Sequence, residues 1–314
     1  MKMTNSLALN LADVGKNYGA VTAVAHVDLS LQTRECVALV GHNGAGKSTL
    51  IKMLLGLVKP SYGSLSVLNQ DPFGAAFNEV RRSIGFLPEQ VLFQKNMTGR
   101  ETLSFYAKLK RLPADTFDDL FERVGLVGAA DRKVGTYSKG MRQKLGMAQA
   151  LMGEPKLLVL DEPTTGLDPI ARQTIYKIID EEKARGATVL ISSHALTELD
   201  ERIDRVAILK AGKVVAVGSI PVLRKNLNMH TDISVMASPE TCDAIEQSLA
   251  ENYRTVRNAP GNVRVSCSID MKVIAMRQIM ALDLVIDDIE LREPTLESVY
   301  NSYSVAPSSG GSDD

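Results

Sequence analysis

The sequence predicts an α/β protein whose large domain holds a mostly parallel sheet and whose small C-terminal domain is α+β. Three short apolar runs, at residues 36–40, 157–160 and 187–192, have the length and composition of strands covered on both faces. Helix-forming stretches separate these runs, and such alternation is typical of a parallel sheet with crossover helices. After residue 230 short strands and helices alternate in a new pattern, of which a ferredoxin-like domain is one known arrangement.

The remaining elements follow from local signals. The pattern T-x-x-E at residues 98–101 is a capping box and predicts a helix that runs towards residue 110. Strong helix formers at 141–151 predict another. Further strands are predicted at residues 205–209, 214–217, 232–236, 262–269 and 285–291, and further helices at 221–227, 239–251, 271–282 and 294–303.

The composition suits one large and one small globular domain. Of the 314 residues, 45% are hydrophobic and 23% are charged, as in ordinary globular proteins. We place the large domain at residues 1–228, the small domain at 229–304 and a polar, disordered tail at 305–314. The net charge of −1 gives the chain no overall attraction to nucleic acid or anionic lipid.

The cysteines and the hydropathy pattern indicate a reducing compartment. Cys36, Cys242 and Cys267 lie far apart and form no C-x-x-C pair, which favours free thiols over disulfides or a zinc site. No apolar run approaches the about 18 residues that span a bilayer, and residues 1–10 lack the pattern of a signal peptide. We therefore expect a cytoplasmic protein that acts at a membrane only through a partner.

A glycine-rich segment, GHNGAGKS at residues 41–48, matches the phosphate-loop pattern G-x-x-x-x-G-K-[ST]. It follows a predicted strand and opens a predicted helix, which a chance glycine-rich loop would not explain. Backbone N–H groups and the helix N-terminus would bind the phosphates of ATP, Lys47 would bridge the β- and γ-phosphates, and Ser48 would hold Mg²⁺. The predicted ATP-binding residues here are Gly41, His42, Asn43, Gly44, Ala45, Gly46, Lys47, Ser48 and Thr49.

Two carboxylates end the apolar strand at residues 157–160. Next to the phosphate loop, Asp161 would hold Mg²⁺ through water, and Glu162 would polarise the water that attacks the γ-phosphate. The alternative is an N-cap aspartate followed by a surface glutamate. The phosphate loop earlier in the chain favours the catalytic interpretation.

With these motifs in place, the chain resembles the ABC ATPase family. Residues 137–141, YSKGM, look like a variant of the family's L-S-G-G-Q signature, in which Ser138 and Gly140 match while Lys139 and Met141 depart. The resemblance implies that this site faces the γ-phosphate held by the opposite subunit, so that a head-to-tail homodimer encloses two ATP molecules. A plain helix N-cap at Ser138 is the alternative.

Further matches follow in the family's order. The resemblance implies that Asp168, in the D-loop at residues 165–168, contacts the other subunit. It also implies that His194 is catalytic together with Glu162 and Lys47, and that Tyr18 stacks on adenine. The alternative for Tyr18 is a core or edge-strand tyrosine.

The Q-loop departs from the family pattern. Glu89 stands where most relatives carry glutamine, and Gln90 follows it. A carboxylate would repel the γ-phosphate unless Mg²⁺ or water lies between them, so either Glu89 or Gln90 could meet the metal. We also expect the segment 89–97 to receive the coupling helix of a permease, as this region does in relatives.

The resemblance covers residues 7–227. It implies a P-loop NTPase with a RecA-like core, an antiparallel β subdomain and a helical signature subdomain, and it implies an ATPase at the cytoplasmic face of the inner membrane. Stretches such as 137–146, 167–171 and 293–300 are similar to ATPases of ABC-2-type exporters, and more narrowly to the NosF-type ATPases. Those work with a NosY-like permease and a periplasmic NosD-like protein to mature the copper sites of nitrous oxide reductase.

Other functions compete with this one. The chain could serve another ABC-2-type exporter, of drug, lipid or polysaccharide. A soluble ABC protein acting on ribosomes or DNA usually has two cassettes or a long coiled coil, and neither is present in this sequence. A nucleotide-gated regulator that hydrolyses poorly is disfavoured by the intact Asp161, Glu162 and His194. For the small domain we favour a packing or dimer-stabilising role.

Overall fold

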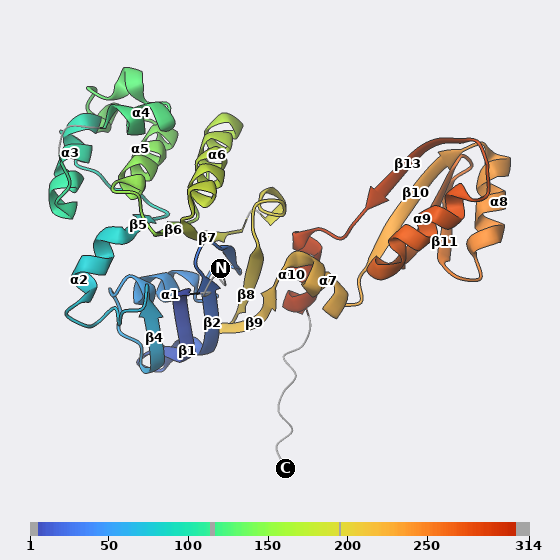
Figure 1. Ribbon diagram of the computed structural model, residues 1–314, viewed down its shortest axis with the longest axis horizontal. Helices are drawn as coiled ribbons and strands as arrows, with labels where there is room; N and C mark the ends of the chain where they lie inside the picture. Colours follow the sequence, from blue (N-terminus) through green and yellow to red (C-terminus); the bar gives the residue numbers. More distant parts are fainter. Residues whose placement is uncertain (1–5, 114–116, 195, 306–314) are drawn as a thin grey trace, which may run out of the picture. The chain divides into compact units, whose positions relative to one another are not determined.

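The computed structural model describes residues 6–113, 117–194 and 196–305 (Figure 1). The chain divides into two compact units, Met1–Val217 and Gly218–Asp314. The division falls before the predicted boundary at residue 228, because helix α7 (Ile220–Asn226) packs against helix α10 (Leu296–Val305) of the second unit. Of the predicted tail at residues 305–314, all residues after Val305 lie outside the described part of the chain.

A six-stranded sheet in the order β5-β6-β7-β3-β8-β9 forms the centre of the first unit. The pairs from β5 to β8 are parallel, which confirms the predicted α/β class. Every residue of β3, β6 and β7 is buried, as expected for strands covered on both faces. The strands are β3 (Cys36–Val40), β5 (Ile84–Leu87), β6 (Leu157–Asp161), β7 (Thr188–Ser193), β8 (Arg205–Lys210) and β9 (Lys213–Gly218).

A three-stranded antiparallel sheet shares a hydrophobic core with this centre. It consists of β1 (Leu7–Tyr18), β2 (Val21–Gln32) and β4 (Tyr62–Val67), in the order β2-β1-β4. Its inward side chains, such as Leu9, pack in one cluster with Leu39 of β3 and with helix α1 (Lys47–Leu54). The helix that follows the phosphate loop is thereby fixed between the two sheets.

The helical part of the first unit carries the signature segment. Its helices are α2 (Phe77–Val80), α3 (Gly99–Lys110), α4 (Asp118–Arg123), α5 (Lys139–Leu151) and α6 (Pro169–Arg185). The predicted capping box is confirmed, since Thr98 Oγ1 accepts from Glu101 N at 3.1 Å and Glu101 Oε2 accepts from Thr98 N at 2.8 Å. Helix α5 approaches β5 closely at Gly85, where an added Cβ would lie 2.2 Å from Ala150 O.

The sheet of the second unit has the order β11-β12-β10-β13, and all its neighbours are antiparallel. The elements β10, α8, β11, β12, α9 and β13 follow the βαββαβ order of ferredoxin-like domains, and α8 and α9 pack against one shared core. They span β10 (His230–Ala237), α8 (Pro239–Leu249), β11 (Arg254–Ala259), β12 (Asn262–Ser268), α9 (Lys272–Met280) and β13 (Ile286–Arg292).

Two expectations about the whole chain can be checked directly. All three cysteines are free and buried, as predicted from their spacing. Burial raises the pKa of the Cys36 thiol to about 12, so this side chain stays protonated and apolar in the core. In the part of the chain that the structure describes, no helix has the length and apolar character needed to span a bilayer.

The close approach of α5 to β5 predicts that Gly85→Ala lowers the free energy of unfolding by about 1–3 kcal/mol, because the new methyl group meets backbone that cannot move aside. Gly128→Ala is the matched control, since an added Cβ there has no neighbour within 4 Å. Urea unfolding of both variants measures the difference. Equal stability of the two variants would show that this contact relaxes without cost.

Candidate functional site

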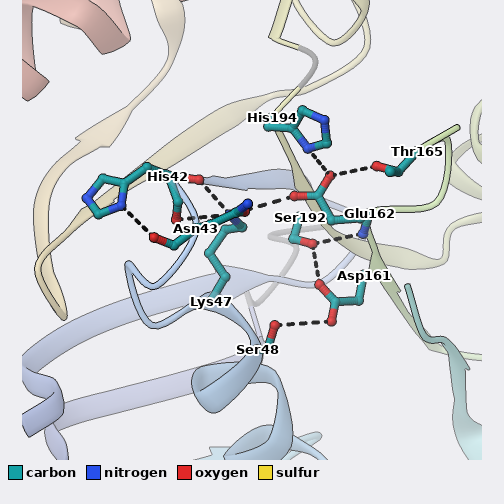
Figure 2. A network of polar contacts seen from close by, with 10 residues as sticks. His42, Asn43, Lys47, Ser48, Asp161, Glu162, Thr165, Ser192 and His194 are labelled. Carbon is teal, nitrogen blue, oxygen red and sulfur yellow. Dashed lines mark hydrogen bonds and ion pairs between the residues drawn. The ribbon is translucent and has the colours of Figure 1, made fainter. Parts of the chain in front are cut away.

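The carboxyl ends of β3, β6 and β7 meet at one edge of the central sheet. The phosphate loop follows β3, Asp161 ends β6 with Glu162 directly after it, and His194 follows β7, so the parallel order brings these three segments together (Figure 2). They surround a cavity of about 540 Å³, a volume usual for a small-molecule site. The lining residues are Tyr18, Val21, Thr22, Ala23, His42, Asn43, Gly44, Gly46, Lys47, Ser48, Thr49, Glu89, Asp161, Glu162, Thr165 and His194.

The phosphate loop is shaped by glycines in the left-handed region. Gly44 has φ of 82° and Gly46 has φ of 108°, and a Cβ on Gly46 would lie 2.7 Å from Ala23 O. These conformations turn the loop tightly into helix α1, as the motif predicts. The predicted residues Gly41 and Ala45 do not line the cavity, although Ala45 N donates to His42 O at 3.1 Å and helps to close the loop.

Lys47 is a buried cation at the centre of the site, with only 7% of its surface exposed. Its Nζ donates to Gly41 O at 2.5 Å and lies 3.6 Å from Glu162 Oε1. A buried ammonium needs such partners because desolvation of an unpaired charge is costly. The position suits a cation that can exchange these contacts for phosphate oxygens.

Glu162 sits in a strained backbone conformation, with φ of 50°. Such a residue persists only where its surroundings hold it, and its N–H donates to Ser192 Oγ at 3.0 Å. Its carboxylate has one neighbour from another segment and one from its own loop: Oε2 lies 2.7 Å from His194 Nδ1 and accepts from Thr165 Oγ1 at 3.2 Å (Figure 2). A held carboxylate beside a histidine can orient and polarise a water molecule.

Asp161 and Ser48 bring oxygen donors together. Asp161 Oδ2 accepts from Ser48 Oγ at 3.5 Å, and Asp161 Oδ1 accepts from Ser192 Oγ at 2.6 Å. A carboxylate and a hydroxyl are the hard oxygen ligands that Mg²⁺ takes together with phosphate oxygens, so this pair fits the metal. Glu89 lines the same cavity and Gln90 does not, so Glu89 is the candidate third ligand.

Sequence reasoning missed Ser192. This buried hydroxyl on β7 contacts both acidic residues, donating to Asp161 and accepting from the backbone of Glu162. Its signal in the sequence is small: a serine close to the carboxyl end of an otherwise apolar buried strand. Sequence order does not reveal that β7 lies between β3 and β6.

Tyr18 stands at the rim of the cavity and is 46% exposed, so it is not a core residue. Lys16 Nζ lies 5.1 Å from the centre of its ring and also donates to Lys59 O at 2.8 Å. This cation–π contact orients the ring. A purine could stack on such a ring.

Besides Gly41, Ala45 and Gln90, three more predicted ATP-binding residues do not line the cavity of their own chain. Ser138 caps α5, accepting from Met141 N at 3.2 Å, and Asp168 caps α6, accepting from Ala171 N at 2.9 Å. An added Cβ on Gly140 would lie 3.9 Å from Asp168 Oδ2. The signature and Asp168 therefore lie together at the beginnings of two neighbouring helices, outside the cavity, whereas Thr165 at the other end of the D-loop lines it.

Comparisons with known proteins show the family of the chain. The family model described as ABC transporter matches residues 24–165. The bacitracin transport ATP-binding protein BcrA of Bacillus licheniformis is 35% identical over 244 residues, which is 77% of this chain and 79% of that protein. The chain belongs to the family of ABC transporter ATP-binding proteins. This ABC protein is also similar to the Nod factor export ATP-binding protein I of Rhizobium sp. (strain N33), at 37% identity over 68% of this chain and 72% of the relative.

Solved structures give the same result for this ABC protein. An ATP-binding subunit of an ABC transporter aligns with a TM-score of 0.66 and 31% identity, over 71% of this chain and 93% of that one. CbiO1 from Clostridium perfringens, part of the transporter complex CbiONQ, aligns with a TM-score of 0.62 and 27% identity over 78% and 96%. The protein is thus an ATP-hydrolysing subunit of an ABC transporter, with ATP and Mg²⁺ as its cofactors.

The position of Glu89 predicts that Glu89→Ala raises the Mg²⁺ concentration for half-maximal ATPase activity by about tenfold, because an oxygen ligand near the metal is lost. Gln90→Ala is the control and should leave the Mg²⁺ dependence unchanged. Titration of Mg²⁺ at a fixed ATP concentration compares the two variants. A shift with Gln90→Ala alone would assign the metal contact to Gln90.

Proposed function

We propose that two copies of the chain close head to tail around two molecules of MgATP and drive an ABC-2-type permease. The observation that carries this proposal is the division of the predicted site. Lys47, Glu162 and His194 line one cavity, whereas Ser138 and Gly140 lie outside the cavity of their own chain. A second copy, turned so that its signature meets the first cavity, completes each site and yields a closed twofold dimer.

In this dimer each residue has a distinct task. Tyr18 stacks on adenine, and Lys47 leaves Glu162 to bridge the β- and γ-phosphates. Ser48 and Asp161 would hold Mg²⁺, with Glu89 in the same cavity, and the metal would neutralise phosphate charge. The other residues of the phosphate loop bind the phosphates through their backbone N–H groups.

Hydrolysis begins at Glu162. Its carboxylate polarises a water molecule for in-line attack on the γ-phosphate, and His194, already in contact with Glu162 Oε2, orients both the carboxylate and the water. The strained backbone of Glu162 and its hydrogen bond to Ser192 keep the carboxylate from turning away.

Closure depends on the γ-phosphate. The N-terminus of α5, with Ser138 and Gly140, carries partial positive charge and binds an anion presented by the other copy. Asp168 contributes from the adjacent D-loop. Loss of the γ-phosphate removes the shared anion, and the two copies separate.

The Glu162→Gln variant tests this proposal. It should bind ATP and remain a closed dimer in MgATP, while its hydrolysis rate falls by about 10²–10⁴-fold because the general base is lost. Size-exclusion chromatography with light scattering and a phosphate-release assay measure the two effects. Glu251→Gln, the same change on the surface of the second unit, is the control. A Glu162→Gln variant that hydrolyses ATP at the parent rate contradicts the assignment.

The surface between residue 89 and helix α3 is the proposed binding site of the permease. A second cavity of about 760 Å³ lies here, lined by Met97, Phe105 and Phe117 together with charged residues of α3. Phe105 is 49% exposed and Leu92 is 85% exposed. An exposed apolar side chain at this cavity, with another in the segment 89–97 that leads to it, suits a short helix inserted by a permease.

The finer proposal is a NosF-type role in the maturation of the copper sites of nitrous oxide reductase, at the cytoplasmic face of the inner membrane. Its support is the resemblance at residues 137–146, 167–171 and 293–300. A NosY-like permease and a periplasmic NosD-like protein are its proposed partners. The relatives named above act in bacitracin transport and Nod factor export, so export of another cargo is the competing role.

Deletion of the gene in its own organism separates these roles. With a NosF-type function, nitrous oxide reductase should accumulate without its complete copper sites, because the transporter has lost its ATPase. Copper analysis of the purified reductase measures its copper content. Complementation with the parent gene should restore that content, and complementation with a Lys47→Ala gene should not. A fully copper-loaded, active reductase in the deletion strain would assign the ATPase to another exporter.

A further inference from the structure

The signature segment contains a lysine that lies on the D-loop of its own chain. Lys139 follows the capping residue Ser138 and begins helix α5. A Cβ added to Gly166 would lie 2.3 Å from Lys139 Nζ and 3.4 Å from its Cε. The end of the lysine side chain therefore occupies the space that a side chain at position 166 would fill, and Gly166, at φ of 70°, provides that space.

The ammonium group of Lys139 has no polar partner among the residues that the structure describes, and the residue is exposed. Other cations nearby differ: Arg142 donates to Tyr137 O, and Arg172 forms an ion pair with Glu198. The nearest carboxylate of the D-loop, Asp168, accepts from Ala171 N as the cap of α6. Lys139 is thus an exposed charge that, within the described residues, packs on Gly166 without a polar partner.

Within one chain, the positive charge of Lys139 lies at an electrostatically unfavourable position. The N-terminus of a helix carries partial positive charge, and a lysine there is repelled by it. The first turn of α5 contains no acidic residue that could compensate. An anion delivered to this helix end would reverse the balance, because the helix dipole and the ammonium would then both attract it.

We propose that Lys139 binds the γ-phosphate of the ATP held by the other copy of the chain. This proposal rests on the head-to-tail dimer proposed above, in which Ser138 and Gly140, on either side of Lys139, meet that phosphate. The flexible side chain moves from Gly166 to the phosphate oxygens and adds a full charge where the common signature has none. The affinity of the dimer should therefore depend more strongly on the γ-phosphate and on ionic strength with Lys139 than it would with a glycine at this position.

A purely structural role is the alternative, in which Lys139 only covers the D-loop. The two roles differ in what they change. Contact with a phosphate of the other copy alters dimer affinity and its salt dependence, but leaves ATP affinity of the monomer unchanged, since Lys139 does not line the cavity of its own chain. Covering the D-loop would instead alter the stability of the isolated chain, and any long side chain would serve.

The test uses the full chain with Glu162→Gln as the parent, so that hydrolysis does not deplete ATP. Lys139→Gln removes the charge at similar length, Lys139→Arg keeps the charge, and Lys144→Gln changes a lysine of the same helix that lies next to Gly125. Analytical ultracentrifugation in MgATP, at two salt concentrations, gives the dimer dissociation constant of each.

We expect Lys139→Gln to weaken the dimer by about tenfold or more, as for loss of one charged hydrogen bond, and to flatten its salt dependence. Lys139→Arg and Lys144→Gln should have the dimer dissociation constant and the salt dependence of the parent. The affinity of the monomer for ATP should be equal in all variants. Dimer affinity and salt dependence of Lys139→Gln equal to those of the parent would overturn the proposal while the dimer itself stands. A parent that stays monomeric in MgATP would overturn both.

Discussion

The alignment of three buried parallel strands is the constraint on which the site depends. Strands β6, β7 and β3 are neighbours in that order, so their carboxyl ends present Asp161, Ser193 and Gly41 side by side. The central strand supplies the link: Ser192 donates to Asp161 and accepts from the backbone of Glu162. One hydroxyl group thereby fixes the proposed metal ligand and the proposed base relative to each other, and the fully buried strands keep all three in register.

The site also shows how a strained residue can be held by ordinary contacts. Glu162 has a left-handed backbone that costs about 1–3 kcal/mol for a residue with a side chain. Its partners are Ser192 and His194 at the end of β7, Lys47 at the start of α1, and Thr165 in the loop that follows β6. Because these segments meet only in the folded chain, the carboxylate is placed by the whole core.

The motifs of the site could be predicted from the sequence because each combines a local pattern with a strand or a helix end. The phosphate loop, the strand ending at Asp161 and the capping box at Thr98 are of this kind. Ser192 could not be found, because its partners depend on strand order. Strand β11 was missed because Arg254–Ala259 has an exposed edge pattern with little apolar signal. Which of Glu89 and Gln90 faces the cavity depends on the direction of one loop, which sequence does not give; in the structure Glu89 lines it.

In the proposed dimer each ATP site is assembled from two chains, and complementation between two inactive variants in mixed dimers is the direct test. Lys47→Ala destroys the cavity of one chain and leaves its signature intact, while Gly140→Asp places an acid where the γ-phosphate of the other chain should bind. An added Cβ at Gly140 meets its neighbours only at ordinary contact distances, so the second variant should fold. Each variant alone should lack ATPase activity. We expect that mixing the two variants restores part of the ATPase activity, because each mixed dimer contains one intact composite site. Mixtures as inactive as the separate variants would contradict it.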